Sequence, residues 1–330
     1  MGRGMVNKGV QVGVETTPGT QVAANKLMPG LSWGVGPRME SKEYRAQGWK
    51  FDTASQRHKY WAEGSLDGPL NFEEIIYPLA TLITPPTPTT PSGGTNSREW
   101  LYKPLGQGNE TLKTLTVEQG DSLAAQIATN VAATDLSFEL AKDDIMVKGN
   151  VIGRAPITGT LTGSPTALPQ QIGSARQIDV YIGNTLGALG VTLFGSGNKV
   201  TDAYSEAFGI GKKLNPRWVH NTDYTSFRDL VELPSKLTAS VSTEHNAQSR
   251  SLFDEIPNNP LKYVGYRVTG PIIEGSIRYM FEIVMAAKIT AAEEGDDDGV
   301  WGYKYNFNPQ YDATLGSAFW IRVVNTRTAL

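Results

Sequence analysis

Hydrophobic and polar residues alternate along several stretches of the chain, with the two-residue period of a strand that has one buried face. Residues 136–140 (LSFEL) place their apolar side chains on one face, and residues 277–285 continue this pattern over a longer stretch. The alternation is strongest in residues 301–307 (WGYKYNF), where the apolar positions are aromatic, and residues 319–324 form a closing strand. We therefore expect a mainly β fold of the α+β class with long strands.

The predicted elements follow the same order in the two halves of the chain. The first unit has a strand at 62–66, a helix at 71–83, a strand at 113–118 and a hairpin at 134–154; the second has a strand at 237–243, a helix at 247–255, a strand at 263–269 and a long strand at 275–290. This repetition predicts two tandem domains, at 31–155 and 175–330, each with a flanking helix and a long hairpin. A linker rich in Pro, Gly and Thr, at 156–174, separates them.

The segments around these units are predicted from turn chemistry. Residues 1–30 are small, polar and rich in Gly, so we expect an extended N-terminal arm that orders against something else, often in an assembly contact. Residues 38–66 predict a hairpin that turns at 52–57. Asn71 is the predicted cap of the first helix, with Glu74 in the capping-box position.

Composition narrows the classes of function. The chain has 330 residues, 35 Gly, 19 Pro, no cysteine and a formal net charge of −3. This charge does not match the basic surface of a protein that grips nucleic acid. No apolar stretch approaches the ~20 residues needed to cross a bilayer, so we expect a protein that is soluble and intracellular when made, with no membrane partner.

The residues that usually carry catalysis or bind cofactors do not form a recognisable set. His58, His220 and His245 are far apart and lack a second ligand at metal spacing. Residues 195–199 and 209–213 only faintly resemble phosphate-binding loops, and the acidic run 293–298 lacks the spacing of a calcium loop. We expect no enzyme, no cofactor and no metal, and thus a structural building block.

Three segments resemble the major tail tube proteins of long-tailed, siphovirus-type bacteriophages: residues 13–20 (GVETTPGT), residues 143–154 (DDIMVKGNVIGR) and residues 298–325. The resemblance implies a β-sandwich or split-barrel domain with a flanking helix, whose sheets join those of its neighbours in a ring. Such rings stack into a tube that conducts the genome. Most members carry one domain and form hexamers, so two domains here imply trimeric rings of sixfold appearance, with a hexamer as the alternative.

The family also implies the partners and the location. The chain would bind copies of itself, tail-tip and terminator proteins, and would enclose the tape-measure protein and double-stranded DNA without reading its sequence. It would be assembled in the host cytoplasm and reside in the tail of the virion.

Two sets of residues are candidates for these roles. The polar faces of the long strands are predicted to line the channel through Ser137, Glu139, Lys148, Asn150, Arg278, Glu282 and Lys288. Residues 209–233, together with the N-terminal arm, are predicted to stack one ring on the next through Lys212, Lys213, Arg217, Trp218, Val219 and Tyr224.

Two other classes of protein fit the same composition. A capsid-decoration or baseplate protein would be equally rich in β-structure, but would form isolated rings or spikes. A carbohydrate-binding or carbohydrate-processing protein would use aromatic side chains such as Trp49, Trp61, Trp218 and Trp301 as stacking platforms.

Overall fold

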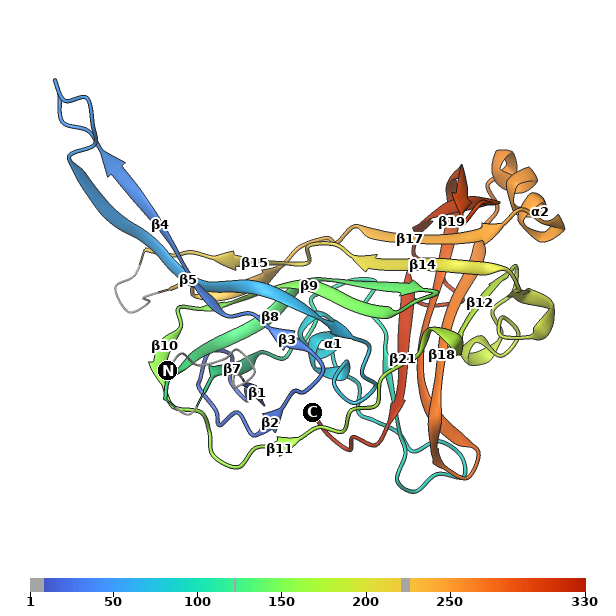
Figure 1. The fold of residues 1–330 in the computed structure, drawn as a ribbon, viewed down its shortest axis with the longest axis horizontal. Coiled ribbons are helices and arrows are strands. Elements are labelled where there is room, and N and C mark those ends of the chain that lie inside the picture. The colour runs from blue at the N-terminus through green and yellow to red at the C-terminus, as the bar shows by residue number, and fades with distance from the viewer. Residues whose placement is uncertain (1–8, 122, 221–225) are drawn as a thin grey trace.

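The computed structural model describes residues 9–121, 123–220 and 226–330, and the fold is mainly β, as predicted (Figure 1). The first half of the chain holds β1 (Gly9–Val14), β2 (Lys26–Leu27), β3 (Ser32–Trp33), β4 (Gly36–Tyr44), β5 (Ala54–Pro69), α1 (Ile76–Leu82), β6 (Arg98–Tyr102), β7 (Leu115–Gly120), β8 (Ala125–Ala141), β9 (Ile145–Arg154), β10 (Ile157–Gly159) and β11 (Thr166–Ala167). The second half holds β12 (Ile178–Gly183), β13 (Lys199–Val200), β14 (Ala203–Ile210), β15 (Leu214–Arg217), β16 (Asp229–Glu232), β17 (Leu237–Glu244), α2 (Ala247–Glu255), β18 (Lys262–Glu274), β19 (Ile277–Asp297), β20 (Val300–Pro309) and β21 (Phe319–Asn325).

The main sheet runs through both halves of the chain. Its strands pair in the order β4–β5–β9–β8–β14–β17–β20–β19, and every neighbouring pair is antiparallel. The halves meet where β8 pairs with β14, with Phe138 opposite Phe208. We call this path the wall sheet.

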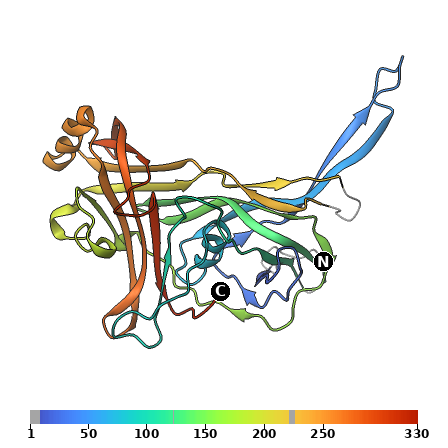
Figure 2. The ribbon, with the colours of Figure 1, turned by 180° about the vertical axis from the view of Figure 1, so that it is seen from behind.

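A second sheet crosses the end of the wall sheet (Figures 1 and 2). It has the order β12–β18–β19–β21–β6, so its last pair again joins the two halves. The long strand β19 belongs to both sheets: its first part pairs with β18 and β21, and its last part pairs with β20. An irregularity in the register between Ile289 and Ala291 lies just after this change.

The core is shared between the halves as well. The ring of Phe138 lies 6.4 Å from that of Phe208 and 5.0 Å from that of Phe281. Helix α1 is buried along its whole length beneath β8, and Pro78 falls in its first turn, where a missing N–H breaks no helical hydrogen bond. The predicted Asn71–Glu74 capping box does not form: Ile75 is the N-cap of α1, and the Glu74 carboxylate accepts hydrogen bonds from the backbone N–H groups of Gly30 and Leu31 and from the side-chain amide of Asn71.

Two of the predicted boundary segments have to be corrected. Residues 9–28 are not a free arm, since β1 pairs with β7 and Val12 and Ala24 are fully buried; residues 1–8 lie outside the described chain. The segment 156–174 is not a free linker either, because β10 pairs with β8, β11 pairs with β2, and Leu168 is buried. Strands β1, β10 and β11 are short, and each forms by pairing with a strand that is already present, namely β7, β8 and β2. The division into two domains stays a prediction.

The first hairpin leaves the body of the molecule (Figure 1). Strands β4 and β5 pair as predicted, but the turn lies at 45–53 and not at 52–57. The hairpin projects far from both sheets (Figure 1), and nearly all of its side chains up to Lys59 are exposed. The second helix, α2, has the predicted bounds, with Asn246 accepting a hydrogen bond from the Ser249 N–H at its start.

Candidate functional site

One face of the wall sheet is polar from β5 to β19. Residues directly opposite each other in an antiparallel pair point to the same face, so the register defines the members of this face. They are Ser65 and Asp67 of β5, Lys148 and Asn150 of β9, Ser137 and Glu139 of β8, Ala207 and Gly209 of β14, Thr238 and Ser240 of β17, Asn306 and Asn308 of β20, and Lys288 of β19. Most of these residues are small or uncharged, and we call the surface the polar face.

Two of the few charges on the polar face, Lys148 and Glu139, neutralise one another. The Lys148 ammonium lies 2.5 Å from the Glu139 carboxylate, and this hydrogen bond raises the pKa of Lys148. The amide of Asn150 donates to both carboxylate oxygens of Asp135 at 3.1 Å. The surface therefore offers no array of free cations that would hold a phosphate backbone.

The structure brings five of the seven predicted channel residues onto this face: Ser137, Glu139, Lys148, Asn150 and Lys288. Arg278 is exposed but lies in the second sheet, next to the turn between β18 and β19, where its guanidinium approaches the carbonyl oxygen of Gly270 at 3.4 Å.

The prediction for Glu282 has to be corrected, because this side chain is fully buried. Its two carboxylate oxygens bind the Nε atoms of Arg267 and Arg322, both at 2.5 Å. A second apolar cluster, which includes Leu193 and Trp320, covers this face of the second sheet, so β19 is buried on both faces here. Periodicity alone identifies the face of a strand, and does not reveal that another segment covers that face.

The predicted stacking residue Lys213 is also internal, so that prediction has to be corrected too. Its ammonium donates to the carbonyl oxygen of Leu82 at 2.6 Å and lies 3.2 Å from Glu232 and 3.5 Å from Glu110. The side chain anchors the β15–β16 hairpin to the end of α1. A buried cation needs such partners, because desolvation would otherwise favour its neutral form.

The other stacking candidates lie on or near the surface. Trp218 is half-buried, with its ring edge-to-face against Trp61 at 5.8 Å and Phe227 at 6.0 Å. Arg217 pairs with Asp229 across the β15–β16 hairpin at 3.0 Å. Lys212 and Val219 are exposed, and Tyr224 lies outside the described residues.

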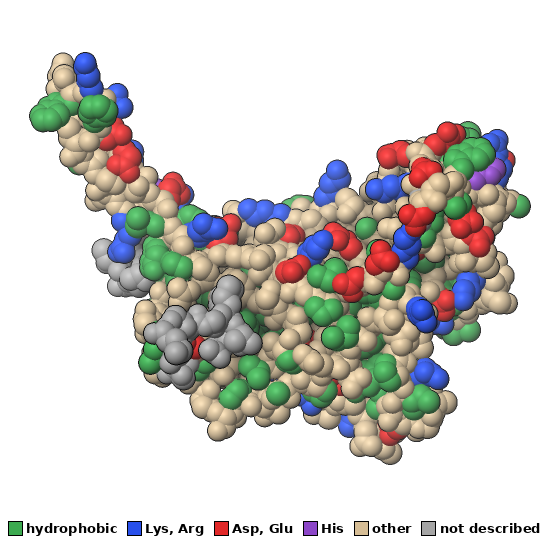
Figure 3. Space-filling model, viewed as in Figure 1, with side chains coloured by type: hydrophobic (Ala, Val, Ile, Leu, Met, Phe, Trp, Pro, Cys, Tyr) green, Lys and Arg blue, Asp and Glu red, His purple; other side chains and the backbone are tan. Residues whose placement is uncertain are grey.

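The exposed tip of the β4–β5 hairpin is a surface that the sequence pattern did not identify. Trp49 is 66% exposed and Phe51 is 79% exposed, and Met39 and Tyr44 on β4 are exposed as well. Apolar side chains gather at the far end of the hairpin in the space-filling view (Figure 3). The sequence did contain an indication of this surface, since several aromatic residues occur in a segment that is otherwise polar. Exposed clusters of large apolar side chains often mark interaction sites.

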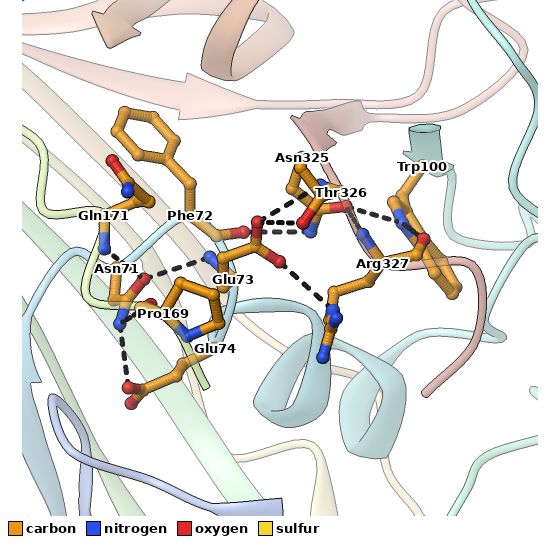
Figure 4. Close-up of polar contacts among 10 residues, drawn as sticks. All are labelled: Asn71, Phe72, Glu73, Glu74, Trp100, Pro169, Gln171, Asn325, Thr326 and Arg327. Atoms are coloured by element: carbon orange, nitrogen blue, oxygen red, sulfur yellow. Dashed lines mark hydrogen bonds and ion pairs between the residues drawn. The ribbon is translucent and has the colours of Figure 1, made fainter. Parts of the chain in front are cut away.

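A buried polar cluster ties the end of the chain to the segment before α1 (Figure 4). Glu73 accepts hydrogen bonds from the backbone N–H and the hydroxyl of Thr326, and lies 3.3 Å from the Nε atom of Arg327. The Asn325 amide donates to the carbonyl oxygen of Phe72, and its own oxygen accepts from the Trp100 indole. These contacts join residues that are about 250 positions apart in the sequence.

The remaining chemical candidates do not come together. Within residues 9–121, 123–220 and 226–330 there is no group of three His, Cys, Asp or Glu that would hold a metal ion. His245 stacks on Trp301 at 3.9 Å, and the acidic run 293–298 occupies the end of β19 and its turn. In the same described part of the chain, no helix has the length and apolar character needed to cross a membrane. Comparison with protein-family models gives no match, and comparison with curated proteins gives none either.

Proposed function

We propose that this protein is the subunit of a viral tail tube, in which rings of the chain stack into a hollow conduit for double-stranded DNA. The observation that carries the proposal is the polar face, which is continuous across strands from both halves of the chain. A conduit wall needs a broad sheet face that stays hydrated and does not bind its cargo. The neutralised charges and small side chains of the polar face meet both needs.

The size of the wall sheet supports rings of three chains. Three copies of the path from β4 to β19 supply about 24 strands, and at ~4.8 Å spacing and a tilt near 45° these close into a barrel roughly 50 Å across the backbone. Side chains narrow this bore, which still leaves room for a DNA duplex and for a tape-measure protein. Sliding DNA would meet paired charges such as Glu139 with Lys148, and no basic track.

The two sandwich domains and the partners in the virion belong to the same proposal. Tail-tip and terminator proteins would cap the ends of the tube in the assembled tail. A ring of six chains is the alternative to the trimer, and a decoration or baseplate protein is the alternative to a tube.

Electron microscopy and native mass spectrometry of the purified protein test this function. We expect tubes without any added nucleotide or enzyme, and rings with the mass of three chains when the tubes are dissociated. Isolated rings or spikes would favour a decoration or baseplate protein, and a six-chain mass would contradict the trimer. A protein that stays monomeric at high concentration over a broad range of salt would refute the proposed function.

A further inference from the structure

The wall sheet ends in two strand edges that have no partner in the described chain. At one end, β4 pairs only with β5. At the other end, β21 and then β20 pair with β19 on one side, the latter along its last part, while on its other side β18 reaches only to Ala287. The free edge of β19 thus begins at Lys288. Unpaired edges of this length invite pairing with another strand, because each carries a row of open backbone N–H and C=O groups.

The hairpin that carries the β4 edge and the end of β19 have net charges of opposite sign, although β4 itself is balanced, with Arg38 and Lys42 against Glu40 and Glu43. The hairpin residues 36–61 contain six basic side chains and three acidic ones: Arg38, Lys42, Arg45, Lys50, Arg57 and Lys59 against Glu40, Glu43 and Asp52. The end of β19 and its turn, residues 293–298, contain five carboxylates and no basic residue. These two regions lie at opposite ends of the molecule, and acidic side chains gather at the β19 end in the space-filling view (Figure 3).

We infer that the free edge of β19 in one copy of this chain pairs with the free edge of β4 in the next copy. This inference rests on the proposed function and names the strands that close its ring. The five carboxylates of residues 293–298 keep β19 from pairing with β19, whereas the excess of basic side chains on the β4–β5 hairpin attracts them. A contact between different edges on each copy is heterologous, which is the type of interface that generates a ring when its rotation closes.

The topology also defines the direction of this contact. The wall sheet has eight antiparallel strands, so β4 and β19 run in opposite directions within one copy. A rotation about the ring axis preserves the direction of every strand along that axis. The β19 strand of one copy therefore meets the β4 strand of the next copy in antiparallel orientation, which continues the pattern of the sheet.

Disulfide crosslinking tests the contact directly, since the natural chain contains no cysteine. One cysteine is placed on β4 (Met39→Cys or Ser41→Cys) and the other on β19 (Thr290→Cys, Ala292→Cys or Glu294→Cys). We expect the double variants to form disulfide-linked multiples up to a closed ring under oxidising conditions. An antiparallel contact requires that moving the β4 cysteine from 39 to 41 shifts the best β19 partner by two residues toward the N-terminus.

The matched control pairs Ser41→Cys with Thr238→Cys, because Thr238 is exposed on β17, whose two edges are already paired within the chain. This pair should give no ladder. Single-cysteine variants should not crosslink either, and dimers of a single variant would show that like edges pair, which would overturn the inference.

Charge reversal provides a second, independent test. Arg38→Glu with Lys42→Glu should lower the assembled fraction at least tenfold, and adding Glu293→Lys with Asp296→Lys should restore it. Arg176→Glu, an exposed charge change away from both edges, should have no effect. If the natural protein forms rings but neither crosslinking nor charge exchange follows this pattern, the inference is wrong and the proposed function stands. If the natural protein forms no assembly at all, the proposed function itself fails.

Discussion

Glu282 shows how one buried carboxylate organises the second sheet. It binds two arginines, Arg267 from β18 and Arg322 from β21, and so joins three neighbouring strands. The guanidinium of Arg267 also lies 3.7 Å from the centroid of the Phe194 ring, which covers the ion pair from outside. Glu282 is thus the shared partner of both arginines, and the carboxylate of Glu99 lies 3.6 Å from Arg322 as well.

Replacing Glu282 by Gln is expected to destabilise the fold strongly. The change leaves the largely buried Arg267 without its counter-ion and leaves Arg322 with Glu99 alone, 3.6 Å away, and breaking a buried ion pair typically costs about 3–5 kcal/mol. Urea denaturation measures the free energy of unfolding. Glu139→Gln is the matched control, because this exposed carboxylate should change stability by no more than about 0.5 kcal/mol. Equal effects of the two changes would contradict the role assigned to Glu282.

Glu206 predicts a dependence of stability on pH. This side chain on β14 is 4% exposed, and burial raises the pKa of its carboxyl from 4.5 to about 8. The folded state therefore keeps a proton that the unfolded state releases between pH 4.5 and 8. Stability should fall across this range, by up to about 1.4 kcal/mol per pH unit, because the folded state binds more protons.

The variant Glu206→Gln isolates this effect. It should leave stability at pH 4 little changed, flatten the decline between pH 5 and 8, and give a more stable protein at pH 9. Chemical denaturation at several pH values measures the slope for both proteins. A slope that the substitution does not alter would show that another group controls the pH dependence.

At the scale of elements, the alternation of apolar and polar residues predicted several of the long strands, but no strand at β6, β12 or β14, although β14 lies in the wall sheet between β8 and β17. The strands around 136–140, 301–307 and 319–324 and the helix at 247–255 are confirmed. The short strands β1, β10 and β11 were missed, because two to six residues carry too little periodicity and gain their stability from the sheet they join. The pattern also predicted the first hairpin, but gave no sign that it would leave the body of the molecule.

The tip of this hairpin is expected to contribute to assembly and not to folding. Trp49→Ser with Phe51→Ser changes only exposed side chains, so the melting temperature of the monomer should stay within about 2 °C. Loss of these apolar anchors should nevertheless reduce the assembled fraction, as seen by sedimentation and electron microscopy. Val191→Ser is the control, since Val191 is 74% exposed on the body of the molecule. Unchanged assembly of the double variant would mean that the tip makes no contact of importance.

For the candidate site, five of the seven predicted channel residues lie together on the polar face, whereas Glu282 is buried in the second sheet and the predicted stacking residue Lys213 is internal. The difference has a physical cause. The face of a strand depends on local periodicity, but the burial of that face depends on which distant segment covers it, as the cluster around Leu193 covers Glu282. Contacts between segments that are far apart in the sequence cannot be inferred from the local pattern of one sequence.

At the scale of the whole molecule, the repeated order of elements predicts two units, while the strand pairing joins them. Strand β8 pairs with β14, β6 pairs with β21, and Phe138 packs against Phe208 and Phe281. Fragments 1–174 and 175–330 expressed separately are therefore expected to lack cooperative unfolding, because each would expose half of a shared core. Thermal denaturation followed by circular dichroism tests this. A fragment that unfolds cooperatively on its own would instead support an independent domain.

The path of β19 has a mechanical consequence. One strand passes without a break from the buried second sheet into the wall sheet, where it meets the polar face. A force that pushes the wall outward, such as the pressure of packed DNA in the proposed conduit, would load the hydrogen bonds between strands, which are individually weak. At β19 the same force is passed along covalent peptide bonds into the core, so the wall is tethered at its edge by the backbone itself.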